Sequence, residues 1–162
     1  MRPSLLLAAA FVALAGVGAA RAETYAIGAL VRPITLDDQH GAPGGVDEGT
    51  RLFLVTRDMG GGRVLKEALA STDQAWLDAR RIVYVADVSG MPALVTRLFA
   101  VPGMRKRAYR VLLDRDGAAT RDAPSGGDRV TVLRLDRLRV TEVVEAATAA
   151  ELRALLDAAP RD

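Results

Sequence analysis

The sequence predicts a single α/β domain, with a central mixed sheet, flanking helices and a C-terminal β-hairpin plus helix. Two apolar runs, Leu52–Val55 and Ile82–Val85, lack the polar alternation of a strand with one wet face, as expected of strands covered on both sides. Apolar residues at helical spacing follow each run, and a short turn and a capped helix close the chain. At 162 residues, the chain can bury a core without metal or disulfide support.

The start of the chain has the pattern of a cleaved export signal over residues 1–22. Arg2 supplies the positive charge, Leu5–Leu14 the apolar segment and Ala20–Ala22 the small-residue cleavage site. A membrane anchor is the alternative, but the apolar segment is short and ends in small residues before a polar chain. We therefore expect a mature domain of residues 23–162 in the periplasm of a Gram-negative bacterium, with no transmembrane segment after cleavage.

Loss of this segment changes the net charge. The full chain has 22 Lys plus Arg and 20 Asp plus Glu, and cleavage removes Arg2 and Arg21 but no acid, which leaves 20 of each. A neutral chain lacks the cationic excess that nucleic-acid binding needs. The chain also contains no cysteine, which excludes disulfides and every mechanism that depends on a thiolate.

The first part of the mature chain is expected to contain little regular structure. Ile34–Leu36 is predicted as a short strand and Asp37–Gly41 as a turn, and residues 42–49 form a polar loop into the central strand. Gly60–Gly62 are expected to end that strand in a sharp turn. The first helix follows Gly62 and runs to about Ala70.

A second strand and helix follow the first pair. Ser71–Asp73 interrupts the first helix, and Trp76 is expected on a further helical turn, as a core or lid residue more than as a ligand platform. After the strand at 82–86, Ser89 can cap a helix and Pro92 suits its first turn. The apolar face of this second helix is Leu94, Val95, Leu98 and Phe99, and it is expected to stop near residues 101–103.

The last third predicts a third strand, a hairpin and a helix. The apolar run at 109–113 is closed by Asp114–Gly117, and a glycine-rich turn at 125–128 precedes the strand at 129–135. Residues 136–138 are short enough for a hairpin turn, so 139–145 should return antiparallel. Thr148 and Glu151 form a capping box for the final helix.

This order resembles the thioredoxin-like fold, and within it the peroxiredoxin-like branch. Residues 34–41 resemble the introductory hairpin of that branch, and 111–117 and 132–136 resemble its two segments in which an apolar run ends in Asp. The chain is similar to exported, cysteine-free, largely uncharacterised thioredoxin-like proteins of the YtfJ type. The resemblance covers roughly residues 30–158 and rests on order and spacing.

The chain departs from the peroxiredoxin pattern at the reactive position. Peroxiredoxins have a Pro-x-x-x-Thr-x-x-Cys motif, and here Thr56 is kept, but Leu52 replaces the proline and Met59 the cysteine. A thioether cannot ionise, so peroxide reduction by that route is unavailable. Related oxidoreductases carry a cis-proline before the hairpin, where this chain has residues 127–129. Gly60–Gly62 do not match the spacing of a dinucleotide-binding turn, so no flavin or other cofactor is expected.

Five features could carry a site, and each has a plainer interpretation. Gly60–Gly62 with Arg63 could bind an anion on free N–H groups, or form a flexible turn. Met59 could sense oxidation, or fill the space of the absent cysteine. Asp37, Asp38 and His40 could bind a metal ion, or form a plain turn. Asp114, Asp116 and Gly117 match half of a calcium-binding loop, or form a plain turn. The basic run of Arg105, Lys106, Arg107 and Arg110 could bind a lipid or a partner, or form a solvated face.

No catalytic or metal-binding set emerges, so the predicted function is a non-enzymatic binding or accessory module. An oxidoreductase, or an oxidoreductase subunit, that is flavin-linked or peroxiredoxin-related and works without a cysteine is the competing hypothesis. A periplasmic protein is the expected partner. It is expected to dock where the ends of two parallel strands meet, at Thr56, Arg57, Asp58, Met59, Met91 and Pro92.

Overall fold

The computed structural model describes residues 24–124 and 126–161. The predicted export signal and Ser125 of the glycine-rich turn lie outside the described residues. No helix in the described part of the chain is both long enough and apolar enough to cross a membrane.

The centre of the fold is a five-stranded sheet in the order β5-β4-β3-β6-β7. Its strands are β3 (Leu52–Thr56), β4 (Ile82–Asp87), β5 (Leu112–Asp114), β6 (Val130–Asp136) and β7 (Arg139–Ala146). β3, β4 and β5 run parallel, and β6 and β7 are antiparallel to their neighbours. The predicted parallel arrangement of the three apolar runs and the C-terminal hairpin are therefore confirmed.

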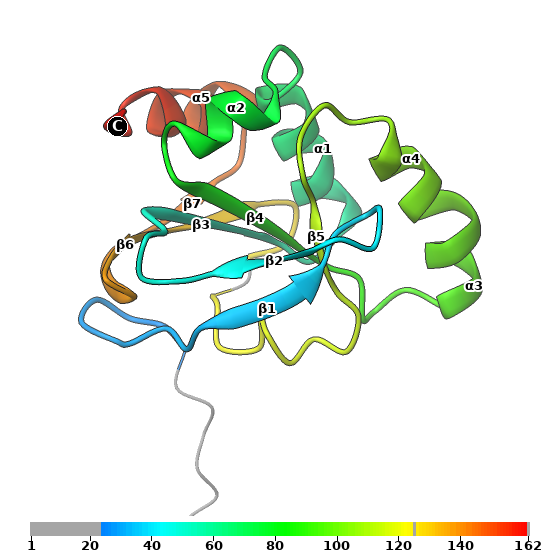
Figure 1. Cartoon of the computed structure of the whole chain (residues 1–162), viewed down its shortest axis with the longest axis horizontal. Coiled ribbons are helices and arrows are strands. Elements are labelled where there is room, and N and C mark those ends of the chain that lie inside the picture. The colour runs from blue at the N-terminus through cyan, green and yellow to red at the C-terminus, as the bar shows by residue number, and fades with distance from the viewer. Residues whose placement is uncertain (1–23, 125, 162) are drawn as a thin grey trace, which may run out of the picture.

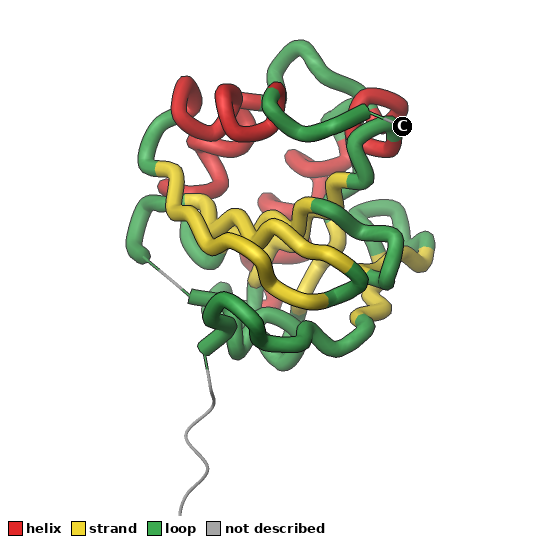
Figure 2. The backbone as a smooth tube through the Cα atoms, turned by 90° about the vertical axis from the view of Figure 1, so that its left-hand side faces the viewer, coloured by secondary structure: helices red, strands yellow, loops and turns green. Residues whose placement is uncertain are grey.

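Helices cover one face of this sheet and loops cover the other (Figures 1 and 2). The helix face is covered by α1 (Met59–Ala68), α2 (Gln74–Asp78), α4 (Val101–Arg105) and α5 (Ala149–Asp157). The loop face is covered by the N-terminal segment, the hairpin of β1 (Ile34–Asp37) and β2 (Pro43–Val46), and the loop after β5. Successive residues of a strand point to opposite faces, so Leu52 and Leu54 contact the helices and Phe53 and Val55 the loops.

The first helix begins earlier than predicted. Asp58 caps α1 with its side chain, so Gly60–Gly62 lie in the first turn of the helix and do not form a turn before it. Two of these glycines are needed for close packing. A Cβ on Gly60 would collide with the carboxylate of Asp128, and a Cβ on Gly61 would lie 2.3 Å from the carbonyl oxygen of Arg129.

The second crossover helix also differs from the prediction. It comprises α3 (Ala93–Val95), a π-helical turn (Thr96–Ala100) and α4, so it continues to Arg105. The Val101 N–H donates to the carbonyl of Thr96, and this wider turn accommodates Pro102, which has no N–H to donate. Ser89 does not cap this helix, because its hydroxyl donates to Asp87 and Pro92 holds the cap position.

Two strands have different bounds from those expected. β2 lies inside the predicted loop of residues 42–49, where a Cβ on Gly45 would lie 1.9 Å from the Ile34 carbonyl oxygen. Side-chain sterics, and not strand propensity, therefore select glycine there. β5 begins at Leu112, because the N–H groups of Arg110 and Val111 are bound by the side chains of Gln74 and Gln39.

The C-terminal elements match the prediction. Asp136 pairs with Arg139, so Arg137 and Leu138 form a two-residue turn in which both φ angles are positive (47° and 66°). The capping box of Thr148 and Glu151 is present at the start of α5. On α2, Trp76 is half-buried between the guanidinium groups of Arg80 and Arg153, at 3.9 and 4.7 Å from its ring centroid.

Candidate functional site

The parallel strands β3, β4 and β5 end together at one edge of the sheet, which we call the carboxyl edge. Their last residues are Thr56, Asp87 and Asp114, and Asp87 pairs directly with Asp114. Strand alternation sends the Thr56 side chain to the helix face and the two carboxylates to the loop face. The carboxyl edge therefore has two separate polar environments.

On the loop face, a polar network fastens the segment after β5 to the sheet. Asp114 is fully buried, and its Oδ2 accepts from the N–H and the hydroxyl of Thr120, both at 2.8 Å. The Thr120 hydroxyl also lies 3.0 Å from Oδ2 of Asp87. Arg57 donates to the carbonyls of Thr120 and Ala123, and its Nε lies 3.8 Å from Asp87. These contacts hold the segment in place and leave Arg57 committed to it.

The N-terminus of α1 is filled by the chain itself. Asp58 accepts from the Gly61 N–H at 2.7 Å and, with its other oxygen, from the Asp128 N–H at 2.9 Å. Asp128 has a φ of 56° and lies in the segment 127–129, for which the sequence predicts the absence of a cis-proline; no cis peptide bond is present among the described residues. Because the Asp58 carboxylate already neutralises the helix dipole, Gly60–Gly62 do not offer a free anion site.

On the helix face, a cavity of about 250 Å³ opens between α1 and the α3–α4 helix. At its base, the Thr56 hydroxyl and the Tyr84 phenol are hydrogen-bonded at 2.8 Å. Arg107, which follows α4, also lines this cavity. Its Nε and Nη1 are buried without an acceptor at standard hydrogen-bond geometry among the described residues, and its guanidinium lies over the ring of Tyr109, 5.8 Å from the ring centroid.

The two tyrosines near Arg107 have shifted acidities. Burial raises the pKa of Tyr84 above the ordinary value of 10.0, although the hydrogen bond with Thr56 and both the charge and the nearby N–H groups of Arg107 act against this. Burial likewise raises the pKa of Tyr109, and Arg107 again opposes the shift. Both phenols are therefore neutral at physiological pH, and the positive charge of Arg107 has no internal counterion on this face.

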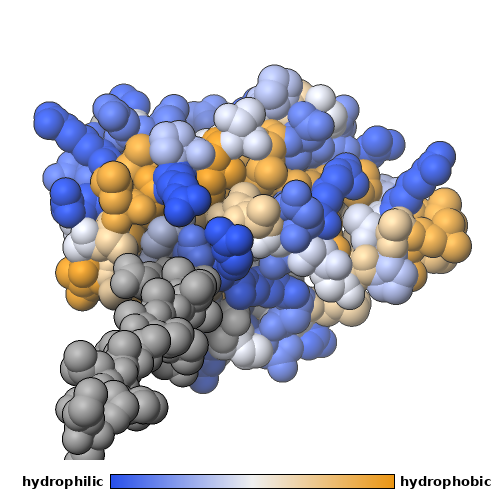
Figure 3. All heavy atoms as spheres, turned by 90° about the horizontal axis from the view of Figure 1, so that it is seen from below, coloured by the Kyte–Doolittle hydropathy of each residue, from blue (hydrophilic) through white to orange (hydrophobic). Residues whose placement is uncertain are grey.

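Large apolar side chains are exposed beside the cavity. The predicted apolar face of the second helix is exposed, because Leu94 and Phe99 are 68% and 72% exposed and no other element of the described part of the chain covers them. Met59 is 76% exposed, so it does not fill the place of a missing cysteine. Figure 3 shows an apolar area at the end of the molecule that carries α3. We call the exposed surface made by Met59, Met91, Pro92, Leu94, Val95, Leu98 and Phe99 the apolar edge.

The remaining predicted sites do not assemble. The imidazole of His40 is exposed, and Asp38 accepts from the backbone N–H groups of His40 and Ala42. Burial raises the pKa of Asp38, but these hydrogen bonds and Arg110 together hold it below its usual value. Within residues 24–124 and 126–161, no group of three or more His, Asp or Glu side chains is placed to hold a metal ion.

The residues of the calcium half-loop and of the basic run also lie in different environments and do not form a common site. Asp114 is bound to Thr120, whereas Asp116 is exposed and accepts from the Ala118 N–H, which lowers its pKa. Members of the basic run point in different directions. Arg105 donates to the carbonyl of Gln39, Arg107 lines the cavity, Arg110 lies 3.4 Å from Asp38, and Lys106 is exposed. They therefore do not form one cationic face.

No family model matches the sequence, and no curated protein matches it. Solved structures do match. The peroxidoxin BcpB of Mycobacterium tuberculosis is 18% identical with a TM-score of 0.52, and the match covers 85% of this chain and 99% of that one. A thiol:disulfide interchange protein of the thioredoxin family from Chlorobium tepidum is 13% identical with a TM-score of 0.52, covering 83% and 97%.

A SCO1/SenC family lipoprotein from Bacillus anthracis matches at 8% identity and a TM-score of 0.51, covering 80% of this chain and 94% of that one. The chain has a thioredoxin-like fold. The predicted fold is thus confirmed, with the mixed sheet, the flanking helices and the C-terminal strands and helix. At these identities the likeness is one of fold, so the narrower resemblance to the YtfJ type stays a prediction.

Three of the six residues that were predicted to bind a partner are accessible in the structure. Met59 and Pro92 are exposed, and Met91 is half-buried at the cavity. Thr56 is buried, and the side chains of Arg57 and Asp58 are bound to other parts of the chain. The prediction missed Tyr84 and Arg107. Strand alternation could have placed Tyr84 beside Thr56, but nothing in the basic run distinguishes Arg107 from its neighbours.

Proposed function

We propose that this thioredoxin-like domain is a binding or accessory module that captures a protein partner outside the cytoplasm and carries out no thiol chemistry. The observation that carries the proposal is the apolar edge. Five of its side chains, Met59, Leu94, Val95, Leu98 and Phe99, are 43–76% exposed. Exposed apolar side chains gathered in this way, such as the four on the α3–α4 helix, are costly in water and are typical of interaction sites.

The site chemistry supports binding over catalysis. The chain has no cysteine, and the strand end that would present a reactive group presents Thr56, which is hydrogen-bonded to Tyr84. The nearby acids Asp58 and Asp87 are committed to backbone and hydroxyl donors. A partner would therefore meet an apolar surface set beside a rigid sheet edge.

Partner capture can be tested with two substitutions matched in exposure. Phe99→Glu places a charge in the apolar edge, whereas Ile27→Glu places one on a side chain that is equally exposed (73% against 72%) but distant in the fold. We expect each protein that co-purifies with the wild-type chain from periplasmic extract to be lost with Phe99→Glu and retained with Ile27→Glu. Equal retention by both variants would reject the apolar edge as the docking surface.

Two further measurements test the other parts of the proposal. Export predicts that the mature protein is recovered from the periplasm and begins at Glu23, which N-terminal sequencing can determine. A protein that still begins at Met1 and stays in the cytoplasm would contradict export. The visible spectrum of the purified protein tests the flavin-linked alternative. A bound flavin absorbs in the visible range, so a colourless protein would reject that alternative.

A further inference from the structure

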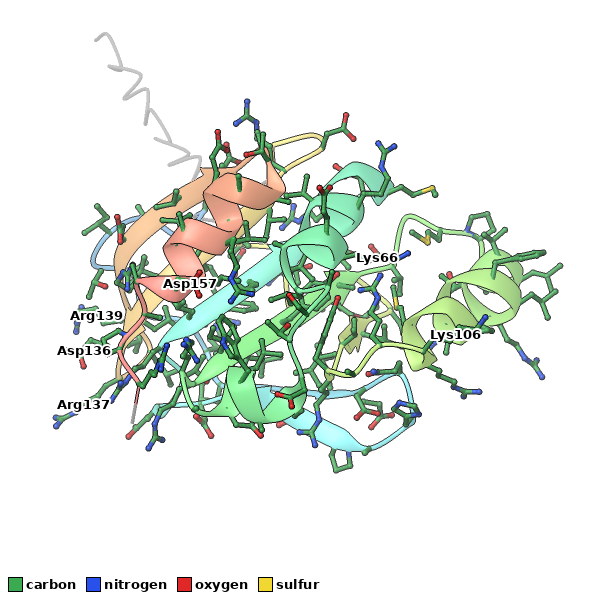
Figure 4. The ribbon with its side chains drawn as sticks, turned by 90° about the horizontal axis from the view of Figure 1, so that it is seen from above. Lys66, Lys106, Asp136, Arg137, Arg139 and Asp157 are labelled. Carbon is green, nitrogen blue, oxygen red and sulfur yellow. The ribbon has the colours of Figure 1, made fainter. Side chains whose placement is uncertain are left out.

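The cavity on the helix face combines an unmatched positive charge with apolar walls. Arg107, Thr56 and Tyr84 supply the polar groups at its base, and Arg63 and Lys66 of α1 line it as well. Figure 4 shows Lys66 pointing from α1 toward the α3–α4 helix. Three cationic side chains therefore face one cavity from two different elements.

The acids that line the same cavity do not balance this charge. Asp58 accepts from the N–H groups of Gly61 and Asp128, and Asp87 accepts from Ser89 and Thr120 on the loop face. None of the ion pairs found among the described residues involves Arg107. The cationic side chains of Arg63, Lys66 and Arg107 therefore leave an excess of positive charge along this cavity, which a bound anion would complement.

The walls determine what kind of anion fits. The apolar lining comes from Ala86, Val88, Met91, Ala100 and Met104, with Met59 at the mouth. Methionine side chains adapt to ligands of different shape. A volume of about 250 Å³ is several times that of a water molecule, which occupies roughly 30 Å³. An inorganic anion would therefore leave most of the apolar wall uncovered.

We propose that this cavity binds a small organic carboxylate with an apolar body, such as a medium-chain fatty acid. The carboxylate lies at the base of the cavity, against the guanidinium of Arg107 and near the Thr56 and Tyr84 hydroxyls, and the apolar body lies along the methionines toward the mouth. Lys66 and Arg63 add long-range attraction at the rim. This inference goes beyond partner capture at the apolar edge, because the cavity can be occupied with or without a docked protein.

The proposal can be tested by NMR titration of the ¹⁵N-labelled mature chain with three probes. Octanoate carries both the charge and the apolar body, 1-octanol carries only the body, and acetate carries only the charge. We expect saturable shifts around the cavity with octanoate, and affinity at least about tenfold lower for each of the other two, because each lacks one of the two contributions. Equal affinity for octanol and octanoate would overturn the role of Arg107.

Two variants locate the site. Arg107→Gln removes the charge at the base, and Lys106→Gln removes the charge of the adjacent, exposed residue outside the cavity. We expect octanoate affinity to fall about tenfold or more with Arg107→Gln, since hydrogen bonds to charged groups are the stronger ones, and to stay within about twofold with Lys106→Gln. The same small loss in both variants would contradict the proposal.

A third variant keeps every charge and closes the space. Gly103 of α4 lines the cavity, and a Cβ at this position meets nothing within 4 Å, so Gly103→Leu adds a bulky side chain at the cavity without a clash and favours the helix. We expect it to abolish octanoate binding even if Arg107→Gln does not fold. Unchanged binding in Gly103→Leu would reject the site. Phe99→Glu, which tests partner capture, lies outside the cavity lining, so the two proposals can fail separately.

Discussion

At the carboxyl edge, the charged groups of the loop face form an ion pair and hydrogen bonds within one network, whereas no ion pair among the described residues involves Arg107 on the helix face. Arg57, Asp87, Asp114 and Thr120 form one network on the loop face, in which only Arg57 Nε and Asp114 Oδ1 lack a hydrogen bond among the described residues. On the helix face, Arg107 lines an open cavity. This difference separates the loop face, for which a stabilising role can be measured, from the helix face, for which we propose a binding role.

The largest effect is expected where α1 meets the segment before β6. Gly61→Ala would place a Cβ 2.3 Å from the Arg129 carbonyl oxygen, which belongs to the backbone and cannot move aside. We expect a loss of about 3 kcal/mol in the free energy of unfolding, the upper range for overpacking. Urea denaturation measures it. Gly62→Ala is the control, since its Cβ meets nothing and should stabilise the helix by about 0.5–1 kcal/mol.

The second effect tests whether the loop-face network is structural. Thr120 is fully buried and joins two carboxylates, so Thr120→Val leaves both acceptors without that hydroxyl. We expect the free energy of unfolding to fall by about 2 kcal/mol, within the range for an unsatisfied buried group. Thr120→Ser restores the hydroxyl and should recover most of the loss. A Thr120→Val protein as stable as wild type would contradict a stabilising role for the loop face.

The third effect is a dependence on alkaline pH that arises on the helix face. In the folded state, burial raises the pKa of Tyr84 and Tyr109 above 10.0, so the unfolded chain releases these protons first. The contribution of these two tyrosines to stability is therefore constant below about pH 10 and falls as the pH rises from there through the raised pKa values. Urea titrations at a series of pH values measure this fall. Tyr84→Phe should make it smaller, at a cost of about 1 kcal/mol at neutral pH for the lost Thr56 bond.

The smallest effect is expected for Arg107. Its Nε and Nη1 have no acceptors, so Arg107→Leu removes a poorly compensated charge and should change the free energy of unfolding by no more than about 1 kcal/mol. Thermal and urea denaturation of the ligand-free protein test this. A loss as large as that of Thr120→Val would show that Arg107 is part of the structural framework, and would remove the contrast between the two faces.

The elements that were predicted correctly depend on local pattern. Apolar runs identify β3 and β4, and the short turn and the capping box identify the C-terminal hairpin and α5. The wrong predictions involve contacts that are distant in sequence. Glycine has low helix propensity, which suggested a turn at Gly60–Gly62. In the structure Gly60 packs against Asp128 and Gly61 against Arg129, and these contacts leave no room for a Cβ within the helix. The same is true of β2, where Gly45 lies against Ile34.

The candidate site shows a further limit of periodicity. Helical spacing correctly places Leu94, Leu98 and their neighbours together, but it does not say whether another element covers them, and here none does. Arg107 has the same local sequence signal as Lys106, and only the packing of α4 against the sheet separates them. The exposed face and the unpaired guanidinium therefore required the three-dimensional structure.

The Asp58 cap limits what could be engineered at this position. In thiol enzymes, the N-terminus of a helix stabilises a thiolate beside it, and this lowers the pKa of the cysteine. In this chain a carboxylate already occupies that end of α1, adjacent to Met59. Met59→Cys would therefore gain a sulfhydryl without gaining its activation, because the neighbouring negative charge opposes a second one. Introducing thiolate chemistry at this position would require changing Asp58 as well, with loss of the hydrogen bond that joins α1 to residue 128.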